Sequence, residues 1–144
     1  MNITAMVAIC MPLVGDDLLV RARDITQKMF AGIGVRIEWR HTGPSCPADA
    51  LQVSLDSPTP ASFYPYAFAY ALPYEGTHIH VFYDRVQAAV VPGRVQQLLA
   101  HVLAHEITHI LEGVVRHSTS GVMKAPWDAD DYQQMAWKPL AFAP

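Results

Sequence analysis

The segment HEITHILEGVVRH, residues 105–117, holds three of the chain's seven histidines. His105 and His109 are four residues apart, so on a helix their imidazoles lie on one face and can share one ion. Glu106 lies about 100° around that helix from His105, where it can reach a metal-bound water without being a ligand. This arrangement suits zinc, which lowers the pKa of bound water to roughly 7 so that a carboxylate can accept its proton.

A third ligand is required, because an open catalytic zinc site has three protein ligands and a water. Gly113 is placed to end the helix, after which the chain can reverse and bring back His117 as the third nitrogen. Glu112 is the alternative, since it lies on nearly the same face as His105. It is about 4.5 Å farther along the helix axis than His109, however, which makes convergence awkward. We therefore expect His117 to be the ligand.

Other histidines have simpler interpretations. His101 lies one helical turn before His105, and we expect a packed or hydrogen-bonded imidazole there. His78 and His80 share one face of an expected strand and are interpreted as ordinary strand residues. HExxH alone is only moderately specific, because a helix can carry two histidines without binding metal. The glycine, the third histidine and the methionine that follow make the pattern more specific.

In that combination the chain resembles the metzincin zinc peptidases, and RHSTSGVMKAPW, residues 116–127, is similar to the third-histidine and Met-turn segment of matrixins. The resemblance implies an α+β fold (an α/β-type sandwich) forming one catalytic domain over residues 1–144. Its parts would be a mixed, twisted five-stranded sheet, a backing helix, an active-site helix, a Met-turn and a C-terminal helix. It also implies that Met123 lies beneath the metal as an apolar floor.

The resemblance further implies where a substrate would bind. Residues 68–86 are similar to the edge strand of the family and the strand after it. A peptide would lie extended along the edge strand, contacting Ala67, Phe68, Ala69, Tyr70, Ala71 and Leu72. By the same analogy, the wall of a specificity pocket would be formed by Lys124, Ala125, Pro126 and Trp127. The expected activity is a metalloendopeptidase with one catalytic Zn²⁺, held by three histidines, and a peptide or protein substrate.

The chain departs from the family pattern in its spacing. It has HExxHxxxGxxxH in place of HExxHxxGxxH, with one extra residue on each side of Gly113. No tyrosine follows Met123 where some metzincins keep an additional transition-state donor, and Tyr70 stands where a matrixin metal-binding histidine would be. Two alternatives remain open. One is an endoribonuclease of the rRNA-maturation type, a family with glycine in place of Glu106; the other is a non-catalytic zinc-binding module.

The rest of the chain must supply the elements that position these residues. Apolar alternation and helical periodicity predict strands at 2–11, 35–40, 50–57, 66–73 and 77–86, and helices at 15–34, 94–112 and 128–137. Asp16 or Asp17 would cap the first helix, and Asp128 the last, with Asp131 in its first turn. The opening strand–helix–strand favours parallel pairing.

Composition limits the class of protein. A chain of 144 residues is most simply one domain, and 51% hydrophobic with 16% charged residues excludes disorder. A net charge of -3 gives no reason to expect a nucleic-acid partner. No signal peptide or membrane span is evident, so we expect a soluble monomer without a membrane partner, cytoplasmic or, if trimmed, secreted. Cys10 and Cys46 could pair or remain free, and a buried thiol is expected at Cys10.

Overall fold

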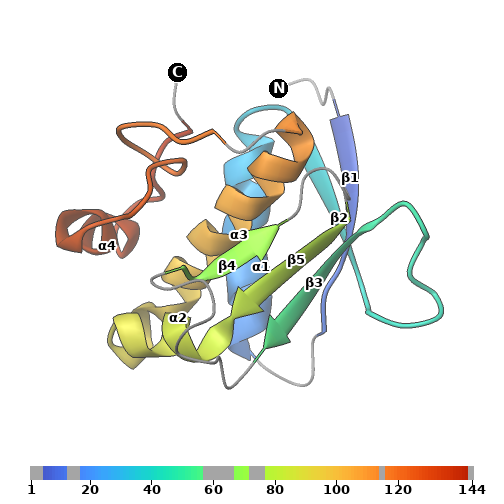
Figure 1. The fold of residues 1–144 in the computed structure, drawn as a ribbon, viewed down its shortest axis with the longest axis horizontal. Helices are drawn as coiled ribbons and strands as arrows, with labels where there is room; N and C mark the ends of the chain where they lie inside the picture. Colours follow the sequence, from blue (N-terminus) through green and yellow to red (C-terminus); the bar gives the residue numbers. More distant parts are fainter. Residues whose placement is uncertain (1–4, 13–16, 57–66, 72–76, 114–115, 143–144) are drawn as a thin grey trace.

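The computed structural model describes residues 5–12, 17–56, 67–71, 77–113 and 116–142, which form a five-stranded mixed sheet with four α-helices (Figure 1). This confirms the predicted α+β class. The strands are β1 (Ala5–Cys10), β2 (Val35–Arg40), β3 (Leu51–Asp56), β4 (Ala69–Ala71) and β5 (His78–Phe82). The helices are α1 (Asp17–Ala31), α2 (Tyr83–Ala89), α3 (Val95–Glu112) and α4 (Ala129–Met135), and η1 (Pro92–Arg94) is a short 3₁₀ turn.

The strand order β2-β1-β3-β5-β4 places one antiparallel strand at an edge of a parallel sheet. β1 pairs in parallel with β2 and β3, and β3 with β5, as the strand–helix–strand start predicts. β4 runs antiparallel to β5, with Tyr70 opposite His80. The short strand β4 therefore forms the sheet edge next to α3 (Figure 1), and the described residues expected to bind an extended peptide, 67–71, lie on it or directly before it in the chain.

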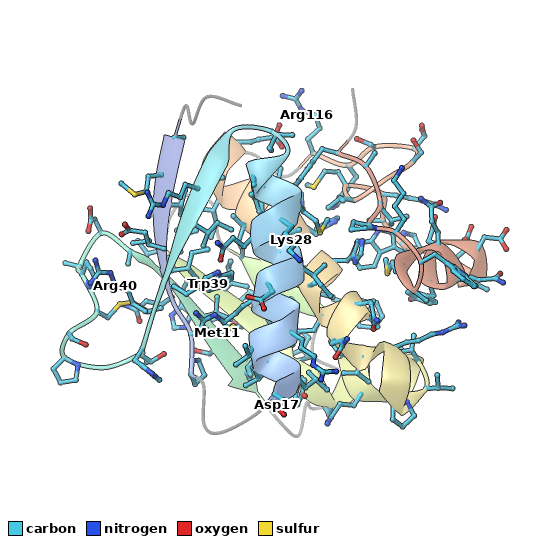
Figure 2. The ribbon with its side chains drawn as sticks, turned by 180° about the vertical axis from the view of Figure 1, so that it is seen from behind. Met11, Asp17, Lys28, Trp39, Arg40 and Arg116 are labelled. Carbon is cyan, nitrogen blue, oxygen red and sulfur yellow. A yellow bond between two sulfur atoms is a disulfide. The ribbon has the colours of Figure 1, made fainter. Side chains whose placement is uncertain are left out.

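Helices α1 and α3 cover one face of the sheet, which Figure 2 shows from the helical side with α1 in front. The inward strand residues Ile9, Ile37, Val53, Ile79 and Val81 are buried with the apolar stripe of α3 in one core. The hydroxyl of Thr26 on α1 is fully buried and shares its proton between the carbonyl of Ala22 on its own helix, at 2.9 Å, and that of Ala100 on α3, at 3.1 Å. That bond, together with the shared core, fixes α3 against the backing helix.

The strand expected at 77–86 is wrong in its second half. The chain is extended only to Phe82, and Tyr83–Ala89 is the helix α2. Alternation continues through this segment, but within the described residues the pairing of β5 with β3 ends at Phe82 and its pairing with β4 at Val81. Val86 is fully buried, and Arg85 anchors the new helix by donating to the carbonyl of Ala67 at 2.8 Å.

The expectation of a free buried thiol at Cys10 is also wrong, because Cys10 and Cys46 form a disulfide. Their Cα atoms are 6.1 Å apart, within the range for a bridge. Parallel pairing places the C-terminal ends of β1 and β2 at the same side of the sheet. The loop that leaves β2 can therefore fold back over Cys10, which is fully buried at the end of β1.

The other predicted elements agree with the structure to within a few residues. Asp17 is the first residue of α1, whereas Asp16 lies outside the described residues. Asp128 caps α4, and it forms a reciprocal capping box with Asp131. Within the described part of the chain, no helix has both the length and the apolar character needed to cross a bilayer.

Candidate metal centre

The three histidines expected to converge do so. One ligand atom from each of His105, His109 and His117 lies within 4.8 Å of the other two. The ring centroids of His105 and His109 are 4.6 Å apart, and the ring centroid of His117 lies 5.2 Å from that of His105 and 5.0 Å from that of His109. His105 and His109 are buried, whereas His117 is exposed. The cluster is therefore half embedded in the protein and open on the side of His117.

The end of α3 makes this convergence possible. Gly113 adopts the left-handed conformation with φ of 73°, and its N–H donates to the carbonyls of His109 and Ile110. This glycine cap ends the helix and lets the chain turn back. Glu112, the alternative third ligand, is exposed and is not part of the cluster. The extra residue on each side of Gly113 therefore still permits His117 to reach the other two.

A tight turn holds the returning segment. The N–H of Ser118 donates to the carbonyl of Met123 at 2.9 Å, and Ser118 also forms a β-bridge with Lys124. Val122 and Met123 are buried within this turn, at 0% and 5% exposure. The residues expected to form the Met-turn therefore do form a closed turn directly after His117. The role of Met123 as a floor for the metal remains a prediction.

A hydrogen bond joins that turn to the metal-binding helix. Nδ1 of His105 lies 2.7 Å from the carbonyl oxygen of Val122. A carbonyl can only accept, so Nδ1 carries the proton and Nε2 keeps its lone pair. Orientation of a ligating imidazole by a backbone carbonyl on its other nitrogen is common in metal sites. The bond thus fixes both the ring orientation and the tautomer that a metal needs.

Burial sets the protonation states of the site. It lowers the pKa of His105 to about 4, the hydrogen bond to Val122 partly opposes this, and charge on His109 and His117 lowers it further. Burial alone raises the pKa of Glu106 to about 7. At neutral pH His105 is therefore neutral, the form that binds metal, and Glu106 is poised between its acid and base forms.

A cavity of about 600 Å³ opens over the cluster. Its lining combines the metal centre, the edge strand and the segment after the turn: Ala67, Phe68, Ala69, Tyr70, Ala71, Val102, His105, Glu106, His109, His117, Lys124, Ala125, Pro126, Trp127 and Tyr132. Every residue proposed for substrate contact lines it except Leu72, which lies outside the described residues. Two separate sequence segments thus enclose one space beside the histidines.

Trp127 connects this cavity to the core. It is only 9% exposed, and its indole N–H donates to the carbonyl of Gly121 at 3.2 Å. Its ring lies edge-on to His105, with centroids 5.6 Å apart, and stacks on Phe68 at 6.3 Å. Trp127 is therefore both a core residue and part of the cavity wall, and it supports the ring of a candidate ligand.

His101 is the hydrogen-bonded core histidine that the sequence predicted. Its Nδ1 lies 2.7 Å from the carbonyl of Gln97, and its Nε2 accepts from the N–H of Leu140 at 3.0 Å. Both nitrogens are thus committed, and burial lowers its pKa. His78 and His80 stack on each other along β5, and Ser54 lies 2.7 Å from Nε2 of His78.

Sequence reasoning missed two residues that line the cavity. Val102 precedes His105 by three residues on α3, so helical periodicity could have placed it on the same face. Tyr132 belongs to α4, and its position in the wall depends on how that helix places it against Phe68. Tyr132 contacts Phe68 edge-on, with centroids 6.4 Å apart. No local pattern in the sequence indicates that contact.

Comparison of the chain with models of known protein families, with curated proteins and with solved structures gave no match. The chemistry of the site is therefore argued from its own geometry.

Replacement of Glu106 by Gln in the metal-free protein tests the burial of this carboxyl. The unfolded chain loses the proton near pH 4.5 and the folded chain near 7, so the folded state loses stability as the pH rises between these values. Glutamine does not ionise. We expect Glu106→Gln to raise the free energy of unfolding by about 3 kcal/mol at pH 7.5 and hardly at all at pH 4.5.

The measurement is urea denaturation at both pH values with a chelator present. The titration of His105 also changes the free energy of unfolding with pH, but this contribution is common to both proteins and cancels in the comparison. An effect of the same size at both pH values would contradict the raised pKa of Glu106.

Proposed function

We propose that this protein is a zinc-dependent metalloendopeptidase in which Glu106 acts as the general base. One observation carries the proposal: His105, His109, His117 and Glu106 line the same cavity as the edge strand β4. A metal site, a proton acceptor and a surface for an extended peptide are the three parts that metal-assisted peptide hydrolysis requires. All three border a single space.

The donor set suits zinc. Three imidazoles are ligands that zinc prefers, and three protein ligands leave a position for water. His105 offers Nε2 because Nδ1 is committed to the carbonyl of Val122, and its low pKa keeps the ring neutral at physiological pH. Zinc bound there would polarise a carbonyl oxygen and lower the pKa of its bound water.

Glu106 is suited to carry the proton. It follows His105 directly on α3, it is 9% exposed, and its side chain lines the cavity. A carboxyl with a pKa of about 7 can accept a proton from water and then donate it to the departing amine at neutral pH. A solvated carboxylate, with its lower pKa, would be a weaker base for the first step.

The edge strand gives the substrate a place to bind. β4 is the last strand in the sheet order, and its residues Ala69, Tyr70 and Ala71 line the cavity. An extended peptide that adds to such an edge gains main-chain hydrogen bonds irrespective of its sequence. Its scissile carbonyl would then lie over the three histidines, between β4 and the segment after the turn.

The resemblance to metzincins supports the same proposal. The turn after His117, the glycine cap at Gly113 and an antiparallel edge strand beside the metal-binding helix all agree with it. A ribonuclease is less well supported. Lys124 is the single lysine or arginine among the lining residues, and it is already paired with Asp128 and Asp131. Phosphate groups would find little positive charge in this cavity.

Zinc binding is tested by comparing two alanine variants. Because His117 belongs to the cluster and Glu112 does not, His117→Ala should weaken zinc affinity at least about 100-fold, whereas Glu112→Ala should leave it unchanged. Zinc content after dialysis and competition with a chromophoric chelator provide the measurement. Loss of zinc in Glu112→Ala with retention in His117→Ala would reverse the ligand assignment.

Turnover is tested with Glu106→Ala and an unfolded protein such as casein. The variant should bind one zinc per chain and lose at least about 100-fold in cleavage rate, because the proton acceptor is gone while the ligands remain. Wild-type cleavage should disappear with a chelator and return with zinc. An active Glu106→Ala enzyme would reject the mechanism, and zinc binding without cleavage in the wild type would favour the non-catalytic module.

A further inference from the structure

Lys124 lines the cavity and is also ion-paired with two carboxylates. Its side chain lines the cavity, and its Nζ lies 2.9 Å from Oδ2 of Asp128 and 2.7 Å from Oδ2 of Asp131. Neither aspartate is among the residues that line the cavity. Lys124 thus links the cavity lining to a pair of negative charges at the start of α4.

Among the described lining residues away from the metal centre, Lys124 is the charged one. Phe68 is in ring contact with both Trp127 and Tyr132, and Tyr70, Val102, Pro126 and several alanines complete this part of the lining. A side chain that enters here meets apolar surface and one charged group, Lys124. The charge preference of the cavity is therefore decided by Lys124 and its two partners.

The two carboxylates are fixed in place. The side chain of Asp131 accepts from the N–H of Asp128, and the side chain of Asp128 accepts from the N–H of Asp131. Burial raises the pKa of Tyr132, and the negative charges of Asp131 and Asp128 raise it further. Both carboxylates therefore act electrostatically on a residue of the cavity wall. Removal of Lys124 would thus expose the cavity to two positioned carboxylates.

We propose that Lys124 is a specificity-determining residue: its ammonium group offsets part of the negative charge of Asp128 and Asp131 beside the cavity, so that the cavity favours an uncharged apolar side chain of a peptide over a basic one. This assignment rests on the proposed function, since it names the side chain that the peptidase would select. Without Lys124, the same cavity should accept a basic side chain.

Binding of two matched peptides tests this assignment without any turnover. The peptides are acetylated, amidated hexa-alanines in which one alanine is replaced by norleucine or by lysine, side chains of similar length that differ in charge. Titration calorimetry is carried out on the zinc-loaded Glu106→Gln protein, which keeps the peptides intact. This parent protein should bind the norleucine peptide more tightly than the lysine peptide.

Lys124→Met should change the ratio of the two dissociation constants by about fivefold in favour of the lysine peptide, which then binds relatively more tightly. A change of this size is typical of a partly exposed ion pair. High salt should reduce that shift, because it screens the carboxylates. Asp131→Asn should shift the ratio the other way, since Lys124 then has one partner fewer. Lys124→Arg and the remote exposed variant Lys138→Met serve as controls and should keep the parent ratio.

An unchanged ratio in both Lys124→Met and Asp131→Asn overturns the assignment, and so does the absence of measurable binding of either peptide. The proposed function is judged separately, by cleavage in the wild type. Loss of cleavage with the expected shifts in binding rejects the peptidase but not the role of Lys124. Cleavage with an unchanged ratio rejects that role but not the peptidase.

Discussion

The hydrogen bond from His105 to the carbonyl of Val122 joins the two segments on which the site depends. One is a long helix anchored in the core, and the other is a loop that returns from the end of that helix. Together with the burial of Val122 and Met123 in the core, this bond holds the turn that follows His117 against α3. With it, the turn that follows His117 is fixed against the same imidazole whose lone pair faces the cavity.

The sheet and the backing helix serve that geometry by burying α3. Because α3 is enclosed between α1, the sheet and the segment that contains Leu140, its histidines and Glu106 lose most of their solvent. Desolvation keeps His105 neutral and brings Glu106 to a pKa near neutrality. The same burial that stabilises the fold through its apolar residues thus prepares the polar ones for chemistry, at a cost in stability that a metal ion could offset.

Local patterns in the sequence were sufficient for the elements that carry the chemistry. Helical periodicity and Gly113 predicted α3 and its end, and the spacing of the three histidines predicted their convergence. The features that were missed depend on contacts between distant segments. The helical turn after Phe82 follows from where the neighbouring strands stop pairing, and the Cys10–Cys46 bridge follows from the path of a loop. The contact of Tyr132 with the cavity follows from the packing of α4.

Zinc K-edge X-ray absorption of the zinc-loaded protein tests the central claim, a three-histidine site open to water, most directly. We predict one zinc per chain with three imidazole nitrogens and one or two oxygen ligands at about 2.0–2.1 Å. A first shell with two imidazoles and a carboxylate, or with four protein ligands and no water, would contradict it.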